Sequence, residues 1–173
     1  LDRSPGTVRA PAPQLGDAPA PTAAPAAPKD GIAPVRPGPL NGFRVLDMGT
    51  FVAGPFTGSL LAELGADVIK VEPATGYPFR QSGFTYNRGM RSLAVDLKRP
   101  EGIEALHAVV RKSDAVVSSN RPGTATALGI DYETLAEVNP DIVLLTLSGY
   151  GEAGPLAGRP GVDMVLQGMS GMM

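Results

Sequence analysis

From residue 43 onward, short apolar runs alternate with segments in which apolar residues recur at helical spacing. Runs of about four to eight residues that are rich in β-branched and aromatic side chains are typical of buried strands. Five runs therefore predict strands, at residues 43–48, 67–72, 92–96, 114–118 and 141–148. The fifth run, DIVLLTLS, is the most strongly apolar of the set.

Between these runs, apolar residues recur every three or four positions, which predicts helices. The predicted ranges are 56–64, 100–112, 122–128, 132–138 and a last helix that begins around residue 163. The first helix places four large apolar residues on one face: Phe56, Leu60, Leu61 and Leu64. The second is expected to turn four residues inward: Ile103, Leu106, Val109 and Val110.

Boundary residues support these helices. Gly65 follows the first helix as a C-cap would, Pro100 opens the second, and Asp131 precedes the fourth as an N-cap. Because strands alternate with helices, the sequence predicts an α/β fold, doubly wound or similar. Parallel strands joined by right-handed crossovers are the expected connections.

The first 40 residues differ in composition from the rest. They hold ten of the 18 prolines, alternate Pro with Ala, and lack any apolar periodicity. Such a segment cannot bury enough surface to offset the entropy of ordering it, so residues 1–40 are predicted to be a disordered Pro/Ala-rich linker. Because the chain begins with Leu1 and ends in an unclosed apolar helix, we expect it to be a piece of a longer protein, with residues 41–173 forming one partial domain.

Composition excludes several functions. Residues 41–173 carry 11 basic and 14 acidic side chains, which gives no general attraction to nucleic acid. The chain has no cysteine, so disulfide scaffolds, thiolate nucleophiles and cysteine-ligated zinc are excluded. No apolar run is long enough to span a bilayer, and no signal-peptide core is present. A cytoplasmic protein without a metal or a membrane partner is the expectation.

The glycine-bearing turn after the first predicted strand, GTFVAG at residues 49–54, faces the crevice where α/β sheets bind ligands. Pro55 and Phe56 stand where a phosphate-binding loop needs Lys and Ser or Thr, so a nucleoside triphosphatase is excluded. NAD binding is disfavoured because the turn lacks G-x-G-x-x-G, although Glu72 could hold a ribose. Small Ala53 and Gly54 would let a bulky cofactor lie against the backbone, or they serve only to tighten strand-to-helix packing.

Single polar residues add two further expectations. Arg88, Arg91, Lys98 and Arg121 are cations that a phosphate-rich ligand would need, and Arg121 precedes a predicted helix start, where free N–H groups favour anions. His107, the only histidine, is expected to be partly buried and structurally satisfied. No partner that would make it a catalytic triad or a metal site lies near it in sequence.

Five ordered blocks resemble a known family. They are LNGFRVLDMGTFVAGP, LAELGADVIKVE, NRGMRSLAVDLKRPEG, NRPGTATALGIDYETLAEVNP and LSGYGEAGPLAGRPGVDMVLQGMSG. In this order they are similar to the family III CoA-transferases, which include formyl-CoA and carnitine-CoA transferases and α-methylacyl-CoA racemases. The resemblance covers residues 40–173.

The resemblance implies the N-terminal part of a large domain with a Rossmann-like parallel sheet and flanking helices. It also implies an interlocked homodimer and a coenzyme A, or acyl-CoA, substrate that lies across the loops after the strands. By position, six residues would line the coenzyme: Ala53, Val95, Lys98, Ser119, Asn120 and Leu128. Arg121 is added, on chemical grounds, as a phosphate contact.

The sequence departs from the family pattern at several of these positions. Pro73 and Ala127 occupy places where arginines occur, Met90 replaces a lysine, and Ser-Ser-Asn at residues 118–120 replaces Glu-Asn-Phe. These departures predict weaker CoA binding. A tandem fusion in which this is the start of the second domain would explain both the departures and the linker.

The family's reaction begins when an aspartate carboxylate attacks an acyl-CoA thioester and forms a mixed anhydride, then an enzyme-bound CoA thioester. That aspartate is expected beyond Met173, so this fragment by itself is predicted to be inactive. Asp163 is expected instead to cap the last helix. Racemases carry a histidine where Val162 stands, so transfer of CoA between an acyl-CoA and a carboxylic acid is favoured over isomerisation. A non-catalytic CoA-binding or dimerisation module remains the alternative from another class.

Overall fold

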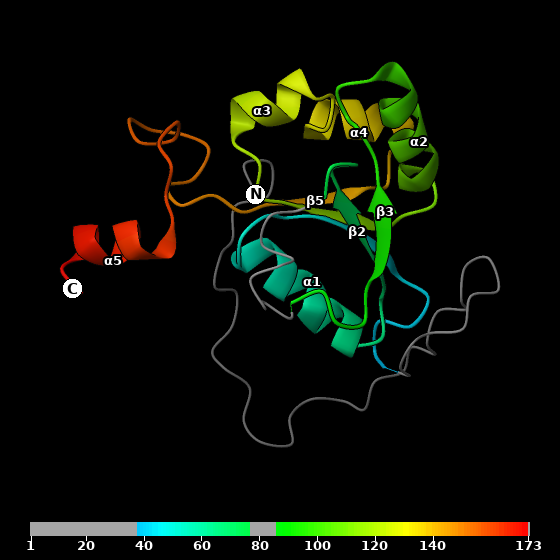
Figure 1. Cartoon of the computed structure of the whole chain (residues 1–173), viewed down its shortest axis with the longest axis horizontal. Coiled ribbons are helices and arrows are strands. Elements are labelled where there is room, and N and C mark those ends of the chain that lie inside the picture. Colours follow the sequence, from blue (N-terminus) through cyan, green and yellow to red (C-terminus); the bar gives the residue numbers. More distant parts are fainter. Residues whose placement is uncertain (1–37, 77–85, 173) are drawn as a thin grey trace, which may run out of the picture.

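The computed structural model describes residues 38–76 and 86–172, which form a sheet with helices on both faces. All strands are parallel: β1 (Arg44–Met48), β2 (Asp67–Glu72), β3 (Arg91–Ala94), β4 (Ala115–Ser118) and β5 (Val143–Thr146). Their order in space is β3-β2-β1-β4-β5 (Figure 1). The α/β fold with a Rossmann-like sheet is therefore confirmed.

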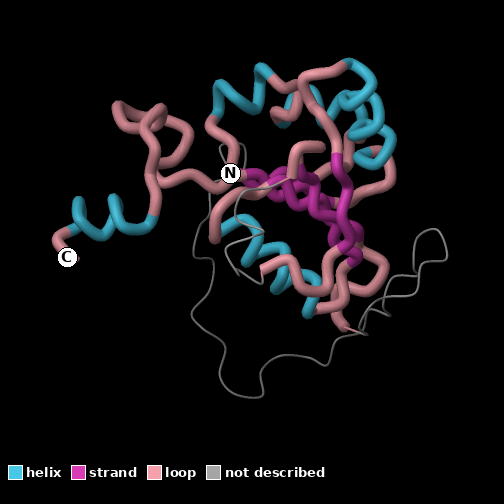
Figure 2. The backbone as a smooth tube through the Cα atoms, viewed as in Figure 1, coloured by secondary structure: helices cyan, strands magenta, loops and turns pink. Residues whose placement is uncertain are grey.

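The helices lie in two layers with the strands between them, as Figure 2 shows. One face is covered by α1 (Ala53–Glu63), and the other by α2 (Pro100–Val110), α3 (Pro122–Ala127) and α4 (Tyr132–Val138). The chain moves from β1 outward to β3 and then returns to β4 on the other side of β1. The crossover from β1 to β2 runs in one direction across the sheet, and the crossovers from β3 to β4 and from β4 to β5 run in the other. Because parallel crossovers share one handedness, the reversal of direction places α1 on one face and α2, α3 and α4 on the other.

Alternation along the central strands divides the core into two clusters. Leu46 and Met48 of β1 face a larger cluster that includes Leu106 of α2 and Leu135 of α4. Val45 of β1 faces a smaller cluster under α1, with the neighbours Ala62, Ala66, Val68 and Val117. Because successive side chains of a strand point to opposite faces, one run of apolar residues serves both clusters.

The buried face of α1 differs from the expected one. Of the four residues on the predicted face, Phe56 and Leu60 are 47% and 45% exposed, and Leu64 just after the helix is 46% exposed. The fourth, Leu61, is half-buried and packs against the smaller core cluster. The helix instead buries Gly54, Pro55, Gly58, Ser59 and Ala62. Small residues let the backbone of α1 approach the sheet closely. The face that α1 buries is therefore the one with small side chains, not the one with the largest apolar side chains.

The strand that looked most apolar lies at the edge of the sheet. β5 covers only residues 143–146 of the predicted range, and Val143 is 62% exposed and Leu145 43% exposed. β5 pairs only with β4 among the described strands, so one of its edges is open. The high apolar content of the segment indicated a strand correctly, but it carried no information about position in the sheet.

The remaining predicted elements match the structure within a few residues. β2 and α4 have the predicted ends, α2 ends at Val110 instead of residue 112, and β3 lies at residues 91–94 instead of 92–96. The predicted linker lies mostly outside the described residues, but its last residue, Leu40, packs against the smaller core cluster, and its N–H donates to the Leu64 carbonyl (3.0 Å). No helix in the part of the chain described is long and apolar enough to cross a membrane.

α5 (Asp163–Ser170) extends away from the sheet and buries none of its residues (Figure 1). The last helix was expected to be capped by Asp163, and this is wrong. The N-cap is Val162, which makes no side-chain cap hydrogen bond. Asp163 is the first helical residue, and its Oδ2 accepts from the Gln167 side-chain amide at 2.6 Å. One turn of helix brings these two side chains together.

Candidate functional site at the carboxyl edge of the sheet

The site lies where β1 and β4 run side by side and the chain diverges. After β1 the chain continues toward β2, whereas after β4 it continues toward β5 on the other side. Ligands of open α/β sheets bind at such a divergence, outside the carboxyl ends of the strands. Two segments meet there: the β1–α1 turn, residues 49–52, and the segment that follows β4, residues 119–121.

The β1–α1 turn is compact because two glycines touch. A Cβ added to Gly49 would lie 2.4 Å from the Gly54 Cα, and one added to Gly54 would lie 2.4 Å from the Gly49 Cα. No side chain fits between the end of β1 and the start of α1. Between them Phe51 adopts a left-handed conformation, with φ of 59°. Positive φ is costly for an aromatic residue, so the surrounding contacts must hold the turn in place.

The turn is bonded directly to the end of β4. The Thr50 backbone N–H donates to the Ser119 Oγ (2.7 Å), and the two hydroxyl oxygens lie 3.0 Å apart. On the same side, the backbone N–H and the side-chain amide of Asn120 both donate to the Ser118 Oγ, at 3.2 and 3.1 Å. The Thr50–Ser119 contacts join the two sides of the strand divergence, and the Asn120 bonds hold the segment after β4 in place.

A buried ion pair lies directly beneath the turn. Lys70 of β2 is 2% exposed and its register partner Asp47 of β1 is fully buried, with Nζ 3.2 Å from Oδ2. Both side chains also reach the backbone of Gly49. The Lys70 ammonium donates to the Gly49 carbonyl, and the Gly49 N–H donates to the Asp47 Oδ1 at 2.7 Å.

Burial dominates the electrostatics of this pair. Desolvation raises the pKa of the Asp47 carboxyl above its usual value of 3.8, although the Lys70 charge and the Gly49 N–H oppose the shift. Desolvation likewise lowers the pKa of the Lys70 ammonium below 10.5, against the attraction of Asp47. Each charge is stabilised by the other, and either one alone would be costly in this position.

The predicted coenzyme residues occupy two kinds of position. Five lie on loops or helix ends beyond the carboxyl edge: Ala53, Lys98, Ser119, Asn120 and Arg121. Val95 is 8% exposed and belongs to the larger core cluster, against which the half-buried Leu128 also packs. The fold thus brings the first group to one edge, whereas the side chains of Val95 and Leu128 serve mainly the core.

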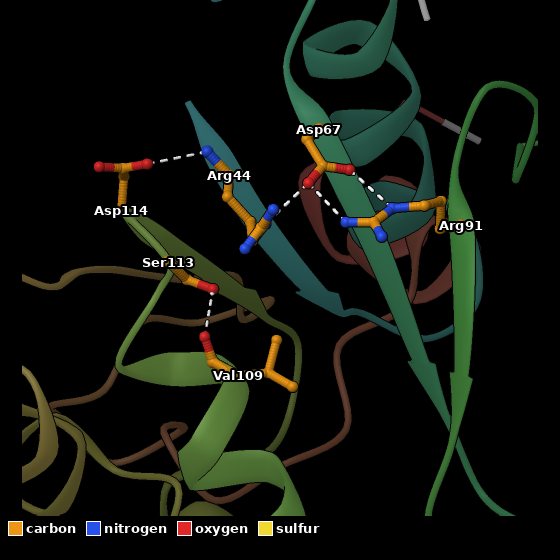
Figure 3. Close-up of polar contacts among 6 residues, drawn as sticks. All are labelled: Arg44, Asp67, Arg91, Val109, Ser113 and Asp114. Carbon is orange, nitrogen blue, oxygen red and sulfur yellow. Dashed lines mark hydrogen bonds and ion pairs between the residues drawn. The ribbon is translucent and has the colours of Figure 1, made fainter. Parts of the chain in front are cut away.

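The structure divides the four predicted cations. Arg91 lies at the amino end of β3, where its guanidinium binds Asp67 through two bonds of 2.8 and 2.5 Å (Figure 3). Arg88 pairs with Glu63 at 3.2 Å, near the end of α1. The structure therefore does not bring the four candidate cations to one edge of the sheet. Among the described residues, Lys98 and Arg121 form no side-chain ion pair, and both follow the carboxyl ends of strands.

The opposite, amino edge of the sheet is tied together by its own polar network. Arg44 of β1 also binds Asp67, with Nε 2.7 Å from Oδ2, and its backbone N–H donates to Asp114 at 2.8 Å (Figure 3). Asp67 therefore serves arginines from both neighbouring strands. The sequence alone could not show that Arg44, Arg91 and Asp67 bind one another at this edge.

Two other residues considered from sequence lie in unexpected surroundings. Glu72 is 5% exposed and the Ser92 hydroxyl donates to its carboxylate at 3.5 Å, so this carboxylate is buried rather than presented at the surface. His107 is partly buried as expected, but its Nε2 is buried without a hydrogen-bond partner among the described residues, so the expectation that it is satisfied is wrong.

Sequence reasoning missed Asp47, Lys70 and Thr50. A signal for the first two was present, because each is a charged residue between two apolar neighbours within a strand. Charges in such strands are rarely buried unless they are paired. Thr50 offered no such signal, because only the tertiary structure brings it to Ser119.

Comparison with known proteins agrees with this architecture. The family model of the CoA-transferase family III matches residues 40–173. The succinate–glutarate CoA-transferase of Agrobacterium fabrum is 39% identical over 158 residues, which cover 81% of this chain and 40% of that protein. The acetyl-CoA:oxalate CoA-transferase of Acetobacter aceti is 39% identical over 153 residues, which cover 81% of this chain and 39% of that protein.

A solved structure gives the same result for the fold. The crystal structure of a CAIB/BAIF family protein from Brucella suis superimposes with a TM-score of 0.75 at 36% identity, covering 80% of this chain and 40% of that one. The present chain thus spans about 40% of the length of the relatives that it matches. The matched sequence and the shared parallel sheet together show that this chain belongs to CoA-transferase family III.

Proposed function

We propose that this domain holds the coenzyme A part of an acyl-CoA over the carboxyl edge of the sheet, in a complete protein that transfers CoA to a carboxylic acid. One observation carries the proposal: the β1–α1 turn is bonded to Ser119, and Lys98 and Arg121 follow strand ends at the same edge of the sheet without ion-pair partners among the described residues. Relatives that match along the chain are named as CoA-transferases.

The chemistry of the edge suits a nucleotide with phosphates. Ala53, the first residue of α1, is small and exposed, so a pantetheine chain could approach the backbone closely. α1 has no side-chain N-cap, and Pro55 has no N–H, so the Ala53 and Gly54 N–H groups are the donors in its first turn that an anion could bind. Lys98 and Arg121 would bind the phosphates as charged donors. Val95 and Leu128 would contribute backbone and apolar surface.

The proposed reaction uses an aspartate that lies beyond residue 173. Its carboxylate attacks the acyl-CoA thioester, and CoA thiolate leaves as a mixed anhydride forms. The thiolate then attacks the aspartyl carbonyl of the anhydride, which releases the donor acid and leaves CoA bound to the aspartate as a thioester. An acceptor carboxylate repeats both steps in reverse, giving a new acyl-CoA and the free aspartate. Covalent catalysis thus replaces one difficult exchange by easier steps.

The substrates and assembly of the complete protein are part of the same proposal. The names of the relatives mention succinate, glutarate and oxalate, so short dicarboxylic acids are the first acceptors to test. We also propose a homodimer in the cytoplasm. The open edge and exposed Val143 of β5, and the exposed apolar residues of α5, provide surface that further polypeptide or a second copy could cover.

Calorimetric titration of the complete protein with CoA tests the binding site. Lys98→Ala and Arg121→Ala should each weaken binding by about tenfold or more, because a hydrogen bond to a charged group contributes about 1.5–3 kcal/mol. Arg111→Ala is the matched control, because Arg111 is an exposed cation at the opposite end of α2. Equal affinities for all three variants would contradict the proposed site, and absence of any heat with wild type would reject CoA binding.

Transfer itself is measured by mass spectrometry, with succinyl-CoA as donor and each dicarboxylic acid as acceptor. Formation of the acceptor's CoA ester supports the proposal. Exchange of the α-proton of a 2-methylacyl-CoA without any transfer would instead indicate an isomerase. Binding of CoA with neither reaction would indicate a binding or dimerisation module.

A further inference from the structure

We propose that Lys70 is a positioning residue of the coenzyme site: with Asp47 it holds both backbone polar groups of Gly49 and thereby sets the position of the β1–α1 turn. Neither residue lies on the surface, so neither touches a ligand directly. The effect on coenzyme binding rests on the proposed function, whereas the effect on the turn does not.

Three elements converge on this pair. Asp47 and Lys70 are register partners on the central strands β1 and β2. From above, α1 closes the pair in, because a Cβ added to Gly58 would lie 2.8 Å from the Asp47 Oδ2. Glu72 and Ser92 continue the same polar layer toward β3. The pair therefore sits between the sheet and α1, next to the residue where β1 becomes the turn.

From Gly49 the constraint passes to the surface by short steps. Gly49 touches Gly54, so the place of Gly49 fixes the start of α1 and with it Ala53. Gly49 also precedes Thr50, whose N–H and hydroxyl meet Ser119 on the far side of the strand divergence. A shift of Gly49 would therefore move the β1–α1 turn relative to the segment after β4, residues 119–121.

Stability alone does not account for this pair. Replacing a buried ion pair with apolar residues of similar volume is often neutral or stabilising, so apolar residues could fill these positions. What apolar residues cannot supply is a donor for the Gly49 carbonyl and an acceptor for its N–H, which are buried polar groups that need partners. The pair is therefore best explained by the turn that it holds.

The same two strands supply a matched control at the other edge. Arg44 of β1 is buried and pairs with Asp67 of β2 at 2.7 Å, far from the turn. Lys70→Met removes the cation of a fully buried pair. Arg44→Met removes a buried cation between the same two strands, but Arg91 still binds the half-buried Asp67. If both pairs only stabilise the sheet, the two variants should behave alike apart from their melting temperatures.

Hydrogen–deuterium exchange of the complete protein measures the turn directly. Lys70→Met should speed exchange of the Gly49 and Thr50 amides by about tenfold or more, the fold-change expected for loss of a charged hydrogen bond, and Arg44→Met should not. Titration of the folded variants with CoA should show an affinity at least about tenfold lower for Lys70→Met and nearly unchanged for Arg44→Met.

Unchanged exchange at Gly49 and Thr50 in Lys70→Met would overturn the inference, whatever happens to CoA. Equal loss of affinity in both variants would also overturn it, because it would indicate a general effect of stability. If wild type binds no CoA, the proposed function fails, and the exchange data still decide the role of Lys70. If Lys70→Met does not fold, Lys70→Met combined with Asp47→Leu removes both charges, and it should fold yet still show the faster exchange.

Discussion

Replacing Gly54 with Ala separates helix propensity from close packing. Gly54 lies in the first turn of α1, where Ala would ordinarily be preferred by up to about 1 kcal/mol. The added methyl group, however, would stand 2.4 Å from the Gly49 Cα and 3.2 Å from the Gly49 carbonyl carbon. Both atoms belong to the backbone, so no side-chain rotation can relieve the contact.

The size of the effect follows from the distance that must be recovered. Ordinary contacts begin at 3.4 Å, so the start of α1 must move away from β1 by about 1 Å. Overpacking of this kind costs about 1–3 kcal/mol. Because both contacts are with backbone atoms, the cost should lie in the upper part of this range, about 2–3 kcal/mol. After a gain in helix propensity of about 1 kcal/mol is subtracted, we expect Gly54→Ala to lower the free energy of unfolding by about 1–2 kcal/mol.

Urea denaturation followed by circular dichroism measures this loss, with Gly123→Ala as the control. Gly123 also lies in a helix, α3, but an added Cβ would meet no atom within 4 Å. The control should be neutral or slightly stabilised. If Gly54→Ala were as stable as the control, helix propensity would dominate, and the close approach of α1 to β1 could not be what holds the turn.

Three further predictions test the core, a cap and the amino edge. Leu106→Ala should cost about 2–5 kcal/mol because its side chain is fully buried, whereas Leu60→Ala should cost under about 1 kcal/mol; equal urea midpoints would contradict the buried faces assigned to α1 and α2. Asp131→Ala should cost about 1 kcal/mol at neutral pH. The Thr134 N–H lowers the pKa of Asp131 below 3.8, so this stabilisation is present above pH 3.8 and disappears as the pH falls through the lowered pKa. Thermal melts in which wild type and Asp131→Ala differ equally at every pH would refute this. Arg91→Ala should change stability by about 0.2–1 kcal/mol and leave CoA affinity unchanged, and a tenfold loss in calorimetry would place Arg91 in the site instead.

Local signals were sufficient for most of the elements. The runs at β2 and α4 predicted both ends of each element, because turn residues and caps bound them. Asp131 was predicted as an N-cap, and its Oδ1 accepts the Thr134 N–H at 3.0 Å. Such features depend on neighbours within a few residues, and the sequence contains those neighbours. The Asp163 cap was wrong because the helix begins one residue earlier than such a cap requires: Asp163 is its first residue and Val162 is the N-cap.

The position of an element in the fold was harder to infer. The apolar pattern placed Phe56, Leu60, Leu61 and Leu64 on one face of α1, but of these four only Leu61 packs against the described core. The residues that α1 buries are small ones, such as Gly54, Gly58 and Ala62. Periodicity records which residues share a face, but it does not show which face can come closest to a neighbour. Likewise, the apolar β5 segment did not reveal that it forms an edge.

By itself, the sequence determined the α/β class, the succession of elements and the family. It also showed that cations and small residues lie near strand ends. Each of these depends only on residues that are close together in the chain. Only the tertiary structure decided which charges meet. At one edge of the sheet, Arg91 and Arg44 bind Asp67, whereas Lys98 and Arg121 lie at the other edge. Lys70 is buried against Asp47 beneath Gly49. The physical reason is that strand register and sheet order join residues distant in the chain, and the energy of a charge depends on the partner and burial that this joining gives it.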